Sequence, residues 1–152
     1  MMRTWAVRIW LLLAAGLFAG LAVACGGSSS SGASTGTGAT AAASAIDVTA
    51  EEWSMKPSAA TATAGEISFK LTNKGATPHE LAIAKTALTP DKLPVVNGAV
   101  DEKQVSPVGR TANVDSGKSE TKVLKLESGK YVLYCNIPAH YGQGMHTALT
   151  VE

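Results

Sequence analysis

One segment near the end of this 152-residue chain carries three kinds of metal-binding side chain at regular spacing. Cys135, His140 and Met145 follow one another at steps of five residues, and Pro138 and Gly142 supply turns between them. Cysteine and methionine sulfur prefer soft metal ions, whereas imidazole binds copper and zinc alike. The spacing therefore predicts a metal site on a loop, and that site needs one more nitrogen ligand.

An upstream histidine can supply that nitrogen. His79 opens the apolar segment 79–84, and strand periodicity places its side chain on the same face as the apolar residues two and four positions later. Cys135 also stands at the end of an apolar segment, so the ends of two neighbouring strands and the following loop can meet. Two histidines, one cysteine and an axial methionine make up the ligand set of blue-copper electron-transfer sites. We therefore predict that His79, Cys135, His140 and Met145 bind one copper ion.

Ordinary packing is the alternative explanation for each of these residues. Cys135 could be a buried thiol, since free cysteine packs well in cores, or a thiol nucleophile beside His140. His79 could be a surface histidine next to a turn, and Met145 could fill the core. Zinc takes the same cysteine and histidine ligands as copper. His146 is predicted to face solvent and not to bind the metal.

Short strands must position these side chains. Alternating or continuous apolar runs between turn residues predict strands and a sandwich or barrel. The expected strands are 46–53, 66–72, 79–84, 118–126, 131–135 and 147–151. Residues 85–117 contain three prolines and no clean period, so a short helix or an extra strand is expected there. The residues predicted to lie in the core are Trp53, Met55, Phe69, Tyr131 and Tyr134.

The N-terminus carries the features of an export signal. Basic Arg3 and Arg8 precede an apolar run that ends in small residues at Ala24, which predicts a signal peptide over 1–24. An uncleaved membrane anchor is the alternative. The segment 21–27 resembles a bacterial lipoprotein signal, in which the cysteine, here Cys25, becomes lipidated. Residues 25–45, nearly all Gly, Ser, Thr and Ala after the cysteine, are predicted to be a flexible linker, followed by a domain over 46–152.

Composition and motifs exclude several other functions. The net charge of +1 gives no basic patch of the kind that nucleic acid requires, so no nucleic-acid partner is expected. There is no Gly-x-Ser-x-Gly nucleophile elbow between a predicted strand and a helix, and no cysteine is paired with a general base in a family signature, so an enzyme is not expected. The chain has only two cysteines, so lipidation of Cys25 would leave Cys135 without an intramolecular partner. A metal-bound thiolate is one explanation for a lone cysteine in an exported protein, and a reactive or intermolecular thiol is the other.

Together these motifs resemble the cupredoxins, and among them the auracyanin and azurin-like members. The turn Asn73-Lys74-Gly75 followed by His79, and the spacing of Cys135, His140 and Met145, carry the resemblance, which covers 46–152. It implies an all-β Greek-key β-sandwich with a long insertion around 85–117. It also implies a single-electron carrier with one copper ion, in which electrons pass through His140. With the lipoprotein signal, it implies a periplasmic or cell-surface protein that serves redox proteins of a membrane electron-transport chain.

The sequence departs from that family in one informative place. Many cupredoxins have asparagine after the first histidine, and here the residue is Glu80. Groups of this kind orient metal ligands and tune the metal, so the resemblance does not fix the reduction potential. Two rival functions remain: a copper-delivery or storage protein, and a redox-inert module that binds zinc or no metal.

Overall fold

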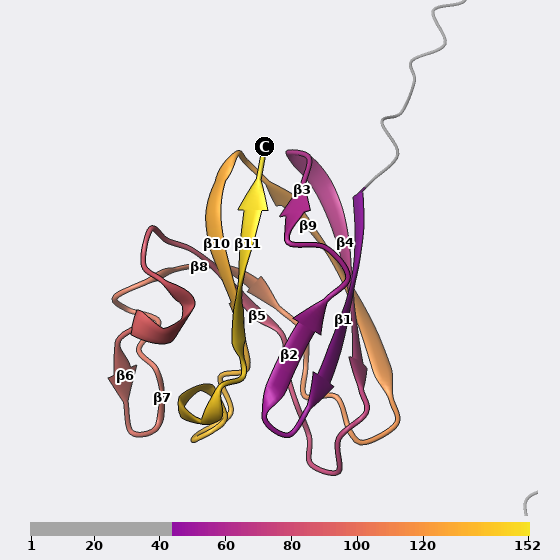
Figure 1. Ribbon diagram of the computed structural model, residues 1–152, viewed down its shortest axis with the longest axis vertical. Helices are drawn as coiled ribbons and strands as arrows, with labels where there is room; N and C mark the ends of the chain where they lie inside the picture. The colour runs from indigo at the N-terminus through magenta and orange to yellow at the C-terminus, as the bar shows by residue number, and fades with distance from the viewer. Residues whose placement is uncertain (1–43) are drawn as a thin grey trace, which may run out of the picture. The chain divides into compact units, whose positions relative to one another are not determined.

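Two β-sheets face one another in residues 44–152, the part of the chain that this computed structural model describes (Figure 1). The first sheet has the order β2 (Ser54–Pro57), β1 (Ser44–Glu51), β4 (Gly65–Asn73) and β9 (Ser119–Leu126). The second has the order β3 (Thr61–Ala62), β11 (His146–Val151), β10 (Gly129–Tyr134), β5 (Ala82–Lys85) and β8 (Ser106–Arg110). The predicted signal peptide, the lipidated Cys25 and most of the predicted linker lie outside the described residues. The last two residues of that linker, Ser44 and Ala45, belong to β1.

The pairing of the strands explains how distant segments meet. β1 runs parallel to β4 in the first sheet, and β3 runs parallel to β11 in the second. The other neighbours pair antiparallel, with β10 between β11 and β5. The predicted all-β Greek-key sandwich is confirmed. Within residues 44–152, no helix is long and apolar enough to cross a membrane.

The main core fills the space between the sheets. Alternate residues of β4, namely Ile67, Phe69 and Leu71, are fully buried, as the period-two pattern of this strand predicts. They belong to one cluster with Leu133 of β10 and Leu149 of β11. Tyr131 and Met55 lie in the same cluster, which confirms their predicted place in the core.

A second, smaller core covers the outer face of β5 and β10. Ala82 and Ala84 of β5 pack there with Val132 and Tyr134 of β10. The segment between β5 and β9 supplies the cover, with Leu93 and Val100 among its residues. Both faces of these two strands are therefore buried, which is why their sequences are continuously apolar. Phe69 and Tyr134 are both buried as predicted, although Tyr134 lies in this outer core rather than between the sheets.

Residues 85–117 are structured, as their length predicts. They contain the short 3₁₀ helix η1 (Pro90–Lys92), a hairpin of β6 (Val95–Val96) and β7 (Ala99–Val100), and the edge strand β8. Each of the six predicted strands has a counterpart, but β5 begins at Ala82 rather than at residue 79. Strands β2 and β3 were not predicted, because they are short and lack a clear alternation.

Candidate metal centre

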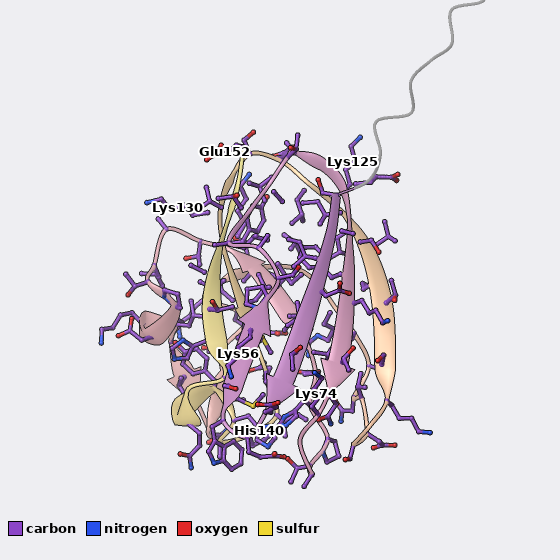
Figure 2. All side chains as sticks on the ribbon, turned by 45° about the vertical axis from the view of Figure 1, so that its right-hand side comes forward. Lys56, Lys74, Lys125, Lys130, His140 and Glu152 are labelled. Carbon is purple, nitrogen blue, oxygen red and sulfur yellow. The ribbon has the colours of Figure 1, made fainter. Side chains whose placement is uncertain are left out.

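Three of the four predicted metal ligands meet at one end of the sandwich, the end at which Figure 2 labels His140. One ligand atom from each of His79, Cys135 and His140 lies within 4.8 Å of the others. The Nδ1 atom of His140 lies 3.2 Å from Nδ1 of His79 and 3.4 Å from Sγ of Cys135. His79 and Cys135 are fully buried, and His140 is 9% exposed. Three donor atoms therefore converge in a site that excludes nearly all water.

His79 is held by the backbone on both sides. It forms an isolated antiparallel bridge with Val114, in which each backbone N–H donates to the other carbonyl, at 3.1 and 2.7 Å. The buried Asn73 fixes the preceding loop, because its amide nitrogen donates to the carbonyls of Thr77 and Val114 at 2.7 and 2.8 Å. Its amide oxygen accepts the N–H of Gly75 at 2.8 Å. The predicted turn after β4 therefore serves to place the first histidine.

The remaining candidates lie on the connection from β10 to β11. Cys135 directly follows β10, and its backbone N–H donates to the carbonyl of Met145 at 3.0 Å. The N–H of Met145 in turn donates to the carbonyl of His140 at 3.2 Å. Between them stands the 3₁₀ helix η2 (Tyr141–Gln143), which ends at Gly144 with a left-handed φ of 115°. Met145 is fully buried in the same core cluster as Cys135, so the fourth predicted residue also belongs to this end of the molecule.

The protonation states of the cluster suit a metal that binds sulfur and nitrogen. Burial raises the pKa of the Cys135 thiol, and the backbone N–H of Glu80, 3.5 Å from Sγ, opposes that shift. Burial lowers the pKa of His79 and of His140. Both imidazoles are therefore neutral at neutral pH, with lone pairs available to a metal. One soft thiolate and two imidazoles match the ligand preference of copper.

Glu80 connects the two segments that carry the candidate ligands. Its carboxylate accepts the backbone N–H of Asn136 at 3.2 Å, next to Cys135 in the chain. Burial raises the pKa of Glu80, and the guanidinium of Arg110, 3.7 Å away, opposes this. Arg110 also pairs with Glu102. A carboxylate balanced by an arginine thus makes the connection for which many cupredoxins use asparagine.

Trp53 covers His140 instead of lying in the core. Its ring meets the His140 imidazole edge-on, with centroids 5.1 Å apart and planes at 78°. The prediction that Trp53 is a core residue is wrong, since it is 42% exposed. Trp53 lies in the short connection between β1 and β2, which places its ring against His140. A single apolar residue before a short strand does not reveal this contact in the sequence.

Glu52, the residue before Trp53, was not identified from the sequence. Its carboxylate accepts the backbone N–H of Ala76 at 2.9 Å, and the N–H and hydroxyl of Thr77 each donate to it at 2.7 Å. These hydrogen bonds, with those from Thr77 the largest, lower the pKa of Glu52 to about 2. Its Oε1 atom also lies 3.3 Å from Nε2 of His79. A lone acidic residue at a strand end carries no motif, so only the structure reveals this contact.

His146 does not face solvent as predicted. It is half-buried, its ring lies 5.0 Å from that of Tyr141, and burial lowers its pKa. Tyr141 is anchored in turn, because its hydroxyl donates to the carbonyl of Pro90 at 2.6 Å and accepts the N–H of Leu93 at 2.8 Å. Among residues 44–152, His146 is not part of the three-residue cluster. His146 instead packs against Tyr141 of η2, on the connection from β10 to β11.

The chain resembles known proteins of one family. The model of the cupredoxin-like domain family matches residues 17–151. A search of the curated proteins finds no match. Auracyanin from the photosynthetic bacterium Roseiflexus castenholzii, solved after reduction with sodium dithionite, is 25% identical and aligns with a TM-score of 0.56 over 72% of this chain and 98% of its own.

Two further solved structures share the fold at lower identity. The azurin Az-iso2 of Methylomonas sp. strain J is 20% identical, with a TM-score of 0.52 over 73% of this chain and 99% of its own. Auracyanin A of Chloroflexus aurantiacus, described as a "blue" copper protein, is 15% identical, with a TM-score of 0.51 over 71% and 98%.

The match and the buried cluster agree on the kind of site. A cupredoxin-like domain in which a cysteine, two histidines and a methionine gather at one end holds one copper ion and serves electron transfer. Since the family model matches most of its length, this chain belongs to the family of cupredoxin-like domains.

Proposed function

We propose that this protein is a membrane-tethered blue-copper electron carrier in which His79, Cys135 and His140 bind the copper ion and Met145 is the axial ligand. The observation that carries the proposal is the buried convergence of two Nδ1 atoms and one thiol sulfur beside a buried methionine. A copper ion bound there takes up and releases one electron as it alternates between Cu(II) and Cu(I).

Backbone hydrogen bonds hold the candidate copper ligands in place, which favours an electron carrier. The backbone of His79 is fixed by Val114, and the carbonyls of Met145 and His140 accept hydrogen bonds within the loop. Groups held this firmly need to rearrange little when the charge of the site changes, which favours fast electron transfer. Burial of Cys135 also keeps water and oxidants away from the thiolate.

Electrons have a short path to the surface at His140. Of the three clustered residues it is the one with some exposure, and the neighbouring Pro138 and Ala139 are exposed and uncharged. Trp53 adds an exposed aromatic surface against the imidazole. Redox proteins often meet through small, transient contacts, and the exposed, uncharged side chains of Pro138, Ala139 and Trp53 suit such a contact.

The direction of β1 supports a tether that leaves the site accessible. Parallel pairing places Ser44, the first described residue, beside Ile67, whereas Asn73 at the other end of β4 adjoins the site. Figure 2 shows Lys125, Lys130 and Glu152 at the end of the sandwich opposite His140. We propose that lipidated Cys25 and the linker 25–45 join the domain at this far end, outside the cytoplasm, so that the copper end can meet redox partners of a membrane electron-transport chain.

Redox cycling with retention of copper separates this proposal from its rivals. The full chain, purified in detergent and loaded with Cu(II), is reduced with ascorbate and reoxidised over several cycles in the presence of a weak Cu(I) chelator. A carrier keeps its copper through every cycle. Transfer of the copper to the chelator on reduction would indicate delivery, and failure to accept electrons would indicate a redox-inert module.

The tether is tested by cell fractionation. We expect the full chain to sediment with membranes and to incorporate labelled fatty acid, and the variant Cys25→Ala to lose the label. A fatty-acid label that persists in Cys25→Ala would refute lipidation at this residue.

A further inference from the structure

The buried His79 imidazole leaves one nitrogen without a hydrogen bond. Its Nδ1 atom points to the metal cluster, 3.2 Å from Nδ1 of His140. Its Nε2 atom is fully enclosed and is the one buried side-chain nitrogen or oxygen without a hydrogen-bond partner among residues 44–152. A buried N–H that remains unpaired is unfavourable, so a polar acceptor within reach of Nε2 is expected to pair with it.

That group is the carboxylate of Glu52. Oε1 of Glu52 lies 3.3 Å from Nε2 of His79, which is within ion-pair distance although the angle does not meet hydrogen-bond geometry. The Glu52 side chain is only 27% exposed, so the contact is partly shielded from water.

The carboxylate is held in this position by the loop that leads to His79. The N–H groups of Ala76 and Thr77 and the Thr77 hydroxyl all donate to it. Gly75 provides the space, because a Cβ atom at this position would overlap the Glu52 carboxylate. The loop therefore contains a glycine where any side chain would push Glu52 away from the histidine.

We propose that Glu52 is a positioning residue for the copper site, which takes the Nε2–H of His79 and thereby commits Nδ1 of that histidine to the metal. This inference rests on the proposed copper site. Histidine ligands usually donate their second N–H to a carboxylate, a carbonyl or water, and the partner fixes the tautomer and raises the basicity of the ligand. Here the partner is an anion, so its effect is electrostatic as well as geometric.

The charge of Glu52 has a definite consequence for the copper. A negative carboxylate behind the imidazole stabilises Cu(II) more than Cu(I), because Cu(II) carries the larger positive charge. Glu52 therefore lowers the reduction potential and strengthens Cu(II) binding. Loss of such a partner typically weakens metal binding by about 10- to 100-fold.

The variant Glu52→Gln tests the charge, and Glu51→Gln is its matched control. Glu51 is the neighbouring residue, and its carboxylate faces Lys56 at 4.0 Å instead of the site. Both variants remove one negative charge, so a difference between them reports contact with His79 and not net charge. We expect Glu52→Gln in the full chain to raise the reduction potential and to weaken Cu(II) binding about 10- to 100-fold, with little change in Glu51→Gln.

A second variant displaces the carboxylate without removing its charge. Gly75→Ala should move the flexible end of Glu52 and shift the potential in the same direction as Glu52→Gln. Equal potentials in Glu52→Gln, Glu51→Gln and the unmodified chain would overturn the proposal, even if Glu52→Gln unfolded at a lower temperature. A chain that forms no thiolate–copper band at all would instead refute the proposed function.

The tautomer provides a readout that needs no copper. In the metal-free full chain at about pH 8, long-range ¹H–¹⁵N NMR should show His79 with its proton on Nε2 and a bare Nδ1. In Glu52→Gln, part of the population should move to the other tautomer. A proton on Nδ1 of His79 in the unmodified chain would contradict the assigned role of Glu52.

Discussion

At the scale of single residues, Cys135 governs the chemistry of the site. Its thiol is fully buried and its pKa is raised by that burial, so the metal-free protein holds a protonated thiol at neutral pH. The same burial lowers the pKa of His79 and His140, which keeps both imidazoles neutral. A metal must displace the thiol proton but no imidazole proton.

Metal uptake is therefore expected to release a defined number of protons per chain. At about pH 7, binding of one Zn(II), which takes the same ligands without redox chemistry, should release about one proton per chain. Because burial lowers the pKa of both histidines, proton release from them should begin only at a lower pH than for exposed histidines. Proton release can be followed with an indicator dye in weak buffer, and release of two or three protons would show that the histidines are charged in the metal-free state.

Trp53 is expected to control access to His140. Trp53→Ala removes the ring that meets the imidazole edge-on and should speed the loss of copper to a strong chelator several-fold. Trp53→Phe keeps an aromatic ring there and serves as the control. The rate is measured from the decay of the copper absorption, and a rate in Trp53→Ala equal to that of the unmodified chain would show that the indole does not shield the site.

At the scale of elements, the strands that hold the site depend on the core between the sheets. Leu71 of β4 is fully buried two residues before Asn73, the residue that ties down the loop before His79. Leu71→Ala should lower the free energy of unfolding by about 2–5 kcal/mol. Val123→Ala on the paired strand β9 is the control, since Val123 is 55% exposed, and should cost less than about 1 kcal/mol. Urea denaturation measures both, and similar losses would contradict the assigned burial.

The sequence predicts those elements well whose side chains alternate in burial. β4 is an example, because one of its faces meets the core and the other meets water. The start of β5 was misplaced, since His79 to Leu81 are buried like a strand but form only an isolated bridge at His79. The elements within 85–117 could not be predicted. Residues of this segment cover the outer face of β5 and β10, and the segment shows neither helix nor strand periodicity.

The predicted ligands could be identified because their types and spacing are unusual, and the structure brings three of them together. The residues that support these ligands, Glu52 and Trp53, could not be identified from the sequence. Glu52 and Trp53 reach the site only because the turn between β1 and β2 lies against the loop before His79 and the loop that carries His140. Contacts of this kind depend on tertiary packing between segments that are distant in the sequence, and a single sequence does not record them.

At the scale of the whole molecule, the two ends of the sandwich differ in role. The donor atoms gather at one end, while Ser44, where the described chain begins, lies at the other. The hairpin of β6 and β7 also adjoins the copper end, where the carbonyl of Gly98 accepts the N–H of Ala139 at 2.8 Å. Segments from both sheets and from the insertion therefore contribute to the site, and metal binding is coupled to the fold as a whole.

Copper is accordingly expected to stabilise the protein globally. At a free copper concentration about 100 times the dissociation constant, the free energy of unfolding should increase by about 2.7 kcal/mol. Thermal unfolding of the full chain with and without copper measures this, and removal of the metal should reverse it. Cys135→Ser should lose most of the increase, and an equal gain in that variant would place the stabilising copper elsewhere.

The thiolate–copper bond is the central claim, and one titration tests it most directly. Optical and EPR spectra of the full chain in detergent are recorded as Cu(II) is added, and then again after ascorbate. We expect an intense blue or green band that saturates at one copper per chain, bleaches on reduction and is missing in Cys135→Ser. A weak spectrum without a thiolate band, or a band unchanged in Cys135→Ser, would contradict the assignment of Cys135 as the copper ligand.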